Sequence, residues 1–244
     1  MRSPIAAAIC LAAIFLLACP AGAFIQTFDT GSAGWGATAN NYTAANLVYN
    51  SSGGNPGGCI SVSLGTNGLA SFDSPLSTFG DLTGQTLTVD IRTSATVSTA
   101  GGSPVVRFYI GTDSNDYWVA TNAARISANT NGAWTTYTVA VNSANFMPWP
   151  YQTGTESFAY VAKNAEYLGI YFTSAGTTPS TPSGTAYTFS SYGITGASGT
   201  TVSLDNFGTP VSNPVPVPPG VWLLGSGLAA FLPRRIRRAR RASR

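Results

Sequence analysis

Thr86-Leu87-Thr88-Val89-Asp90-Ile91-Arg92 is the stretch of sequence that decides the fold class. Its apolar and polar residues alternate one by one, and a period of two places them on opposite faces of a β-strand. The residues at 87, 89 and 91 are therefore expected to face the core, and those at 88, 90 and 92 to face out. This pattern predicts a half-buried strand.

Short strand signals of the same kind recur along the chain, bounded by Gly, Asn, Pro and Ser. Turn dipeptides such as Asn131-Gly132 lie between them, and no stretch shows a helical period with caps. About eight or nine strands without crossover helices predict an all-β fold, a single antiparallel β-sandwich. The further strands are expected at 58–64, 105–110, 117–120, 134–141, 168–173, 187–192 and 202–207.

Two tryptophans and one cysteine are expected in the core of this sandwich. Trp35 and Trp134 lie in strand signals, and Cys59 is the one cysteine outside the N-terminal region. A lone cysteine forms no internal disulfide, and such residues are usually small buried hydrophobes. Two longer loops, 147–157 and 174–184, interrupt the strands.

Charge and composition exclude several classes of function. The chain has no histidine, which removes Ser-His-Asp and Cys-His catalysis and the commonest transition-metal ligand. The part of the chain between its two ends carries four basic residues, Arg92, Arg107, Arg125 and Lys163, against nine acidic ones, a net charge of −5. That balance gives no electrostatic footprint for nucleic acid.

The N-terminus has the features of a secretory signal peptide, 1–23. A basic start at Met1-Arg2 is followed by an apolar run over 5–18 and a small-residue site, Ala21-Gly22-Ala23, for signal peptidase. The mature chain is then expected to begin at Phe24, and the folded domain to span 24–211. Leu16-Leu-Ala-Cys19 also resembles a lipobox, so whether Cys19 is lipidated stays open.

The C-terminus has three parts in a fixed order. A proline-rich spacer at 212–220 precedes an apolar run at 221–233 and an arginine-rich tail at 234–244. The positive-inside bias holds such a tail in the cytoplasm. The part of the run before Pro233, 221–232, reaches only about 18 Å as a helix against a hydrocarbon core of about 30 Å. A transient membrane anchor that is later cleaved is therefore expected, and an ordinary tail anchor is the alternative.

The C-terminal segment resembles the PEP-CTERM sorting tail of Gram-negative bacteria. The resemblance rests on Val215, Pro216, Val217 and Pro218, followed by the apolar run and the arginines. Val217 stands where family members commonly have Glu, so this is the Val-Pro-x-Pro variant. The resemblance implies an exosortase-type membrane protease as partner, a transient inner-membrane intermediate, and delivery to the cell surface or the exopolysaccharide matrix of a biofilm.

The body resembles laminin type IV A (laminin B) modules and carbohydrate-binding-module jelly rolls. The resemblance covers most of 26–208 and depends on the order of several short motifs. It implies a non-enzymatic, adhesive β-sandwich of the jelly-roll type. The motifs are Phe28-Asp29 to Trp35, Asn55-Pro56-Gly57-Gly58, Ser74-Pro75 to Leu82, Trp134-Thr-Thr-Tyr137 and Val202 to Phe207.

Exposed aromatic side chains stack on the apolar faces of sugar rings, while nearby polar groups bind the hydroxyls. Trp149 and Tyr151, flanked by prolines in the first long loop, are the leading candidates for glycan binding. Tyr117 and Trp118 come next. An extracellular polysaccharide or surface glycan is the expected partner.

Asp29 and Asp205 are candidates for a structural calcium site, although no cofactor is required. In a jelly roll that resembles the modules named above, the first and last strands are neighbours, and carboxylates with backbone carbonyls suit Ca²⁺. The alternative is that both carboxylates accept hydrogen bonds from nearby backbone.

Two other functions stay open beside the glycan-binding one. A glycan-active enzyme would need paired carboxylates about 5–10 Å apart. Its candidates, Asp113, Asp116, Glu156 and Glu166, are expected to be solvated loop residues, so we expect no enzyme and no catalytic residue. A purely structural matrix protein is the second alternative, and it requires no aromatic binding surface.

Overall fold

The computed structural model describes residues 24–113, 116–149, 154–175 and 193–209. They belong to one compact unit, 1–210. The predicted signal peptide, the spacer, the apolar run, the arginine tail and the strand predicted at 187–192 lie outside the described residues.

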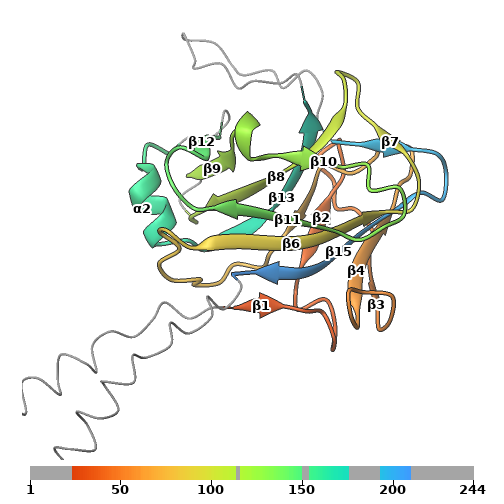
Figure 1. Cartoon of the computed structure of the whole chain (residues 1–244), viewed down its shortest axis with the longest axis horizontal. Coiled ribbons are helices and arrows are strands. Elements are labelled where there is room, and N and C mark those ends of the chain that lie inside the picture. Colours follow the sequence, from red (N-terminus) through yellow and green to blue (C-terminus); the bar gives the residue numbers. More distant parts are fainter. Residues whose placement is uncertain (1–23, 114–115, 150–153, 176–192, 210–244) are drawn as a thin grey trace, which may run out of the picture. The chain divides into compact units, whose positions relative to one another are not determined.

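All but two of the described strands form two antiparallel sheets that pack face to face (Figure 1). The first, named here the β6 sheet, has the order β11-β6-β15-β4-β3, with β1 also paired to β15. It contains β1 (Ile25–Gln26), β3 (Leu47–Asn50), β4 (Cys59–Ser63), β6 (Thr86–Thr93), β11 (Thr135–Ala140) and β15 (Thr201–Gly208).

The second, named the β8 sheet, has the order β12-β9-β8-β13-β5-β2, with β10 also paired to β8. β7 (Val97–Ser98) and β14 (Thr195–Gly196) form a separate small pair. The predicted antiparallel β-sandwich is therefore confirmed. The β8 sheet contains β2 (Gly36–Thr38), β5 (Ser71–Asp73), β8 (Pro104–Gly111), β9 (Tyr117–Ala120), β10 (Ile126–Ser127), β12 (Phe146–Pro148) and β13 (Tyr167–Ser174).

A single apolar core lies between the sheets. Leu87, Val89 and Ile91 of β6 are fully buried in it, as the alternating pattern predicts. Across the interface, the Phe108 ring of β8 stacks on Tyr137 of β11 with centroids 4.5 Å apart. Aromatic pairs of this kind add about 0.5–1.5 kcal/mol beyond the burial of their area.

The two tryptophans expected in the core differ in their surroundings. Trp35 is buried, and its ring packs edge-on against Phe28 and Phe207. Trp134 is only half-buried, and the prediction that it belongs to the core is wrong. It precedes β11 on the outer side of the β6 sheet, where the guanidinium of Arg92 lies 4.7 Å from the centre of its ring.

Asp90 and Cys59 show what the outer face of the β6 sheet holds. The side chain of Asp90 lies on that face as predicted, yet it is buried, because Asn55, Thr136 and Asn206 donate hydrogen bonds to its carboxylate. Cys59 is a free, buried cysteine, as predicted. Burial raises the pKa of its thiol.

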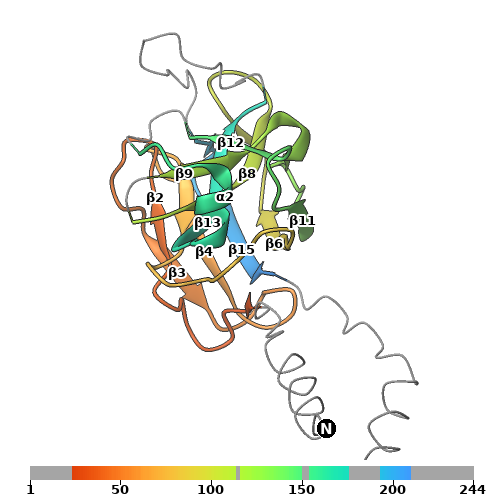
Figure 2. The ribbon, with the colours of Figure 1, turned by 90° about the vertical axis from the view of Figure 1, so that its left-hand side faces the viewer.

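Two short helical segments were not predicted, and α2 corrects the expectation of a chain without helix. The other is one 3-10 turn, η1 (Asn122–Ala124). α2 (Phe158–Lys163) begins after Ser157, whose Oγ accepts a hydrogen bond from the Tyr160 N–H. Its buried residues, Phe158, Val161 and Ala162, have the i, i+3, i+4 spacing of one helix face. Figure 2 shows α2 beside β8 and β9, which it contacts.

Candidate functional site

The outer face of the β8 sheet, on the side away from the core, carries a row of tyrosines. Along β8, Val106, Phe108 and Ile110 point into the core, so Tyr109 between them points outward. On the neighbouring strand, the outward positions of β13 are occupied by Tyr167 and Tyr171. Three rings from two adjacent strands therefore share one face.

Two glycines make room for the rings of Tyr109 and Tyr117 on the face of the sheet. Gly169 of β13 is directly opposite Tyr109, and a Cβ added there would be 2.5 Å from the Tyr109 ring and closer still to a backbone oxygen. Gly111 is directly opposite Tyr117 of β9, and a Cβ there would collide with the Tyr117 ring. Each ring thus covers the backbone of a glycine, as aromatic residues do opposite glycine in designed sheets.

A cavity of about 590 Å³ opens on this face. Its size falls within the usual range of ligand pockets, about 300–1,000 Å³. Tyr42 stands at its rim and is 72% exposed. The described residues that line the cavity are Thr38, Tyr42, Ala70, Ser71, Asp73, Ser74, Tyr109, Tyr117, Trp149, Tyr167 and Tyr171.

Trp149 closes one side of the cavity. Its ring packs edge-on against Tyr171, with centroids 4.6 Å apart, and more loosely against Tyr109, at 6.4 Å. The Trp149 backbone N–H donates to the carbonyl of Tyr117 at 2.7 Å, so the segment after β12 continues along β9. Trp149 is therefore fixed against the sheet, and Met147 and Pro148 belong to strand β12 instead of the long loop expected at 147–157.

Asp73 is the one carboxylate among the described residues that line the cavity. Its Oδ2 accepts hydrogen bonds from the hydroxyls of Thr38, at 2.8 Å, and Ser71, at 3.0 Å. Its Oδ1 accepts one from the Tyr109 hydroxyl at 2.7 Å. Three side chains of the cavity floor are thus oriented by a single acid.

The phenols of Tyr109 and Tyr117 stay protonated at neutral pH. Burial raises the pKa of Tyr109 well above its usual value, and the charge of Asp73 and the hydrogen bond to it raise it further. Burial also raises the pKa of Tyr117, with smaller effects from Tyr167 and Asp73. These tyrosines therefore offer apolar ring faces and neutral hydroxyls.

Arg107 of β8 is a cationic residue that pairs with one of the tyrosines of this face. It lies directly opposite Tyr171, and its buried guanidinium donates from Nη1 to the carbonyl of Ala120 at 2.9 Å. Burial, helped by nearby Arg125, lowers its pKa to about 10, so it stays charged at neutral pH. Arg107 is not among the described residues that line the cavity.

Of the four residues predicted to bind glycan, only two are described as lining this cavity. Trp149 and Tyr117 line the cavity. Trp118 points to the opposite side of β9, because neighbours along a strand alternate, and it packs edge-on against Phe158 of α2 at 5.5 Å. Trp118 is therefore not part of this cavity, and its role in glycan binding stays a prediction; Tyr151 lies outside the described residues.

Asp29 and Asp205 hold the same short segment of chain, 55–58. β1 and β15 are neighbours, as expected of the first and last strands. Asp29 Oδ1 accepts from the Gly58 N–H at 3.3 Å, and Asp205 Oδ2 accepts from the Asn55 N–H at 2.6 Å. These are the backbone hydrogen bonds of the alternative interpretation, and the calcium site stays a prediction. Within the described ranges, no group of three or more acidic or cysteine side chains is placed to hold a metal ion.

Two of the four loop acids, Asp116 and Glu166, are not simply solvated as expected, whereas Asp113 and Glu156 are exposed. Asp116 is buried, and its Oδ1 accepts from the Glu156 N–H at 2.9 Å. Glu166 Oε2 accepts from the Asp113 N–H at 2.8 Å. Asp116 and Glu166 therefore fasten neighbouring loop segments, and none of the four is among the described residues that line the cavity.

In the described part of the chain, no helix is long and apolar enough to cross a membrane. The predicted membrane segment at 221–233 lies outside that part.

No protein-family model matches the chain, and no curated protein matches it. Neither resemblance stated from the sequence is thus supported by a family match.

Among solved structures, the chain is similar to the family 11 carbohydrate-binding module of the cellulosomal cellulase Lic26A-Cel5E of Clostridium thermocellum. The identity is 18% and the TM-score 0.45, over 77% of this chain and 94% of that one. The Clostridium thermocellum family 11 module in complex with a β-1,3-1,4-mixed-linked tetrasaccharide matches at 17% and 0.46, over 77% and 95%. A Clostridium thermocellum xylanase 10B structure with CBM22-1 and GH10 modules, complexed with xylohexaose, matches at 12% and 0.40, over 76% and 27%. Identities and TM-scores at this level do not assign this chain to a family or to a ligand.

Proposed function

We propose that this β-sandwich binds an uncharged glycan, without catalysing a reaction, in the aromatic cavity on the outer face of the β8 sheet. The observation that carries the proposal is the combination of a wall of aromatic rings with a floor of hydroxyls held by Asp73. Sugar rings have apolar faces and hydroxyl edges, which this arrangement complements.

Hydrogen bonding at Asp73 favours a ligand rich in hydroxyl groups. An ionised carboxylate has about four acceptor sites, and Thr38, Ser71 and Tyr109 occupy three of them. One site is left for the hydroxyl of a ligand. Because Thr38 and Ser71 direct their protons to Asp73, their oxygens remain as acceptors for further hydroxyls.

Charge favours a neutral ligand. The described residues that line the cavity include one carboxylate and no lysine or arginine. An acidic sugar would meet Asp73 without a compensating cation, and unpaired charge is costly to desolvate. A neutral chain has no such penalty.

The delivery of this domain is a separate part of the proposal and depends on the two ends of the sequence. We propose that signal peptidase removes 1–23, that the sorting tail holds the protein briefly in the inner membrane, and that an exosortase-type protease releases it to the surface or matrix of a Gram-negative bacterium. Mass spectrometry of protein from the native host should then show a new C-terminus within or near 215–220. Recovery of protein ending at Arg244 would contradict this.

A glycan array probed with the purified full chain tests the binding proposal, and two exposed tyrosines make a matched pair. Tyr42 lies at the rim of the cavity, whereas Tyr160 lies on α2 outside the set of lining residues, and both are largely exposed. Tyr42→Ala should weaken binding about five-fold or more, the effect of losing a contact of about 1 kcal/mol. Tyr160→Ala should leave binding unchanged. Equal effects of the two substitutions, or no neutral glycan bound at all, would refute the proposal.

The glycan found on the same array also serves to test the alternative, a glycan-active enzyme. Incubation with the bound glycan would then release shorter products, and replacing one of the loop acids would abolish the release. A purely structural matrix protein would bind no glycan through Tyr42.

A further inference from the structure

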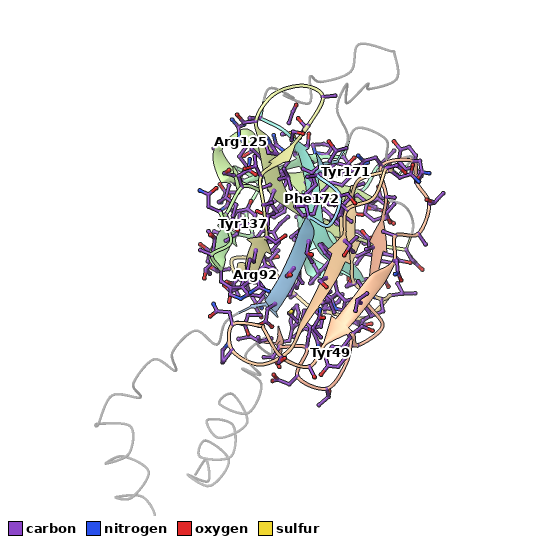
Figure 3. The ribbon with its side chains drawn as sticks, turned by 90° about the vertical axis from the view of Figure 1, so that its right-hand side faces the viewer. Tyr49, Arg92, Arg125, Tyr137, Tyr171 and Phe172 are labelled. Atoms are coloured by element: carbon purple, nitrogen blue, oxygen red, sulfur yellow. The ribbon has the colours of Figure 1, made fainter. Side chains whose placement is uncertain are left out.

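The outer face of the β6 sheet has a hollow of its own, of about 430 Å³, lined mainly by polar side chains. It lies on the opposite sheet from the aromatic cavity, because Arg92 belongs to β6 and Tyr171 to β13; both residues are labelled in Figure 3. Three residues cross the floor of the hollow in register. Arg92 of β6 is directly opposite Ser203 of β15, which is directly opposite Ser61 of β4.

Arg92 is prepared for a partner that the chain does not supply. Its side chain is half-buried, and its guanidinium lies over the ring of Trp134, 4.7 Å from the centroid. Within the described residues, Arg92 forms no ion pair, and its five N–H donors make no hydrogen bond. A planar cation that is stacked on one side and free at its edge suits the bidentate binding of a carboxylate.

Two carboxylates on the same face as Arg92, those of Asp90 and Asp205, already accept hydrogen bonds from other residues. Asp90 and Asp205 lie two residues along their strands from Arg92 and Ser203. Asp90 accepts hydrogen bonds from Thr136, Asn55 and Asn206, and Asp205 accepts from the N–H groups of Asn55 and Asn206. Both carboxylates are therefore directed toward residues 55 and 206, and Arg92 is left available to a ligand.

The remaining lining groups suit a sugar. Ser203 is 3% exposed, yet its hydroxyl makes no hydrogen bond to any described residue. Ser61 Oγ accepts from Asn50 Nδ2 at 2.8 Å, which leaves its proton free to be donated. Neutral hydroxyls that both donate and accept match the hydroxyls of a glycan.

We propose that this hollow is a second glycan site, which binds a sugar residue carrying a carboxylate. Arg92 holds the carboxylate, and Ser203 and Ser61 bind neighbouring hydroxyls. With a single cation at the site and a net charge of −5 on the body, the ligand is a sparsely charged chain with isolated uronate residues, because a dense polyanion would be repelled.

The experiment compares two tetrasaccharides that differ at one carboxyl group, each titrated into the full chain by calorimetry. One carries a single glucuronate residue, and the other is the same molecule with that carboxyl methyl-esterified. The acid should bind at least about ten-fold more tightly, since hydrogen bonds between charged groups contribute about 1.5–3 kcal/mol. Equal affinity for the two would overturn the proposal.

Arg92→Gln should remove that preference, whereas Lys163→Gln, which removes an exposed cation from α2, should change affinity less than two-fold. The binding of a neutral glycan should be unaffected by Arg92→Gln, which separates this proposal from that for the aromatic cavity. The proposal of a second site is overturned if Arg92→Gln still binds the glucuronate tetrasaccharide more tightly than its ester. It is also overturned if an acidic peptide, hexaglutamate, binds through Arg92 as tightly as the sugar does.

A measurement on the unmodified protein covers the case in which Arg92→Gln does not fold. The indole N–H of Trp134 gives a separate NMR signal, assigned by comparison with Trp134→Phe. The acidic tetrasaccharide should shift this signal, and its ester should not. A signal that stays in place at saturating acid overturns the proposal.

Discussion

Replacing Trp149 with alanine should change both glycan binding and stability, by amounts that the ring contacts allow us to estimate. Trp149 packs edge-on against Tyr171 and Tyr109. Two aromatic pairs of about 0.5–1.5 kcal/mol each give a loss of about 1–3 kcal/mol in the free energy of unfolding. At about 2–4 °C per kcal/mol for a domain of this size, Tm should fall by about 2–12 °C.

Binding should weaken separately from this loss. A stacked aromatic anchor contributes about 1–2 kcal/mol, so Trp149→Ala should raise the Kd for a neutral glycan about five- to thirty-fold at 25 °C, where the variant is still folded. Trp149→Phe should recover most of the stability and part of the affinity, because a smaller ring still reaches Tyr171. Calorimetry for Kd and thermal unfolding for Tm measure the two effects.

Trp134→Ala is the matched control. Trp134 is also half-buried and also stacks on a neighbour, but it lies on the other sheet. It should cost some stability and leave the binding of a neutral glycan unchanged. If Trp149→Ala binds like the unmodified protein, or if Trp134→Ala weakens the same binding equally, Trp149 has no specific part in the site.

Three further predictions concern other parts of the domain. Gly169→Ala should lower the free energy of unfolding by about 1–3 kcal/mol, the usual cost of overpacking, because the new methyl group meets the Tyr109 ring and a backbone oxygen. A urea titration curve that matches that of the unmodified protein would contradict this. Burial raises the pKa of Asp205; backbone hydrogen bonds oppose this shift, and the charges of Asp90 and Asp29 add to it. The folded protein therefore binds the Asp205 proton more tightly than the unfolded chain does. The resulting stabilisation is fully present below about pH 3.9 and is lost as the pH rises through the raised pKa. The stability difference between the unmodified protein and Asp205→Asn should therefore decrease from pH 4 to pH 7 in EDTA, and a reversed slope in calcium chloride would support the predicted calcium site. The isolated fragment 24–211 should unfold in one cooperative step as a monomer with a β-type circular dichroism spectrum, and a dominant helical signal would contradict the fold.

The strands were predictable where one side of the strand is polar. In β6 the alternation of residues 86–92 identifies both the strand and its inward face. The short strands β2 and β5 were missed, because three residues are too few to show a period. α2 was missed for the same reason, since six residues give fewer than two turns. The finer assignment to the jelly-roll type stays a prediction.

The candidate site was only half predictable. Trp149 and Tyr117 stood out as aromatics among turn residues and short strands, but Tyr109 and Tyr171 are hidden in strands that are buried almost throughout. Val105-Val-Arg-Phe-Tyr-Ile110 has an apolar residue on both faces of the strand, so no alternation marks which face carries the site. A tyrosine directly across from a glycine on the next strand was the missing signal, and it exists only once the register is known.

The pairing of β1 with β15 has a mechanical consequence. β15 is bonded to β4 on one side and to β6 on the other, and the Thr209 N–H just beyond it donates to the carbonyl of Phe24 at 2.7 Å. If the chain is pulled after Thr209 while a ligand holds the opposite sheet, the force runs along β15, at right angles to its ladder hydrogen bonds. Those bonds then share the load in shear and break together. Pulling between Phe24 and Thr209 would instead open the β1–β15 pair one bond at a time. Resistance to force therefore depends on which end of the domain is tethered.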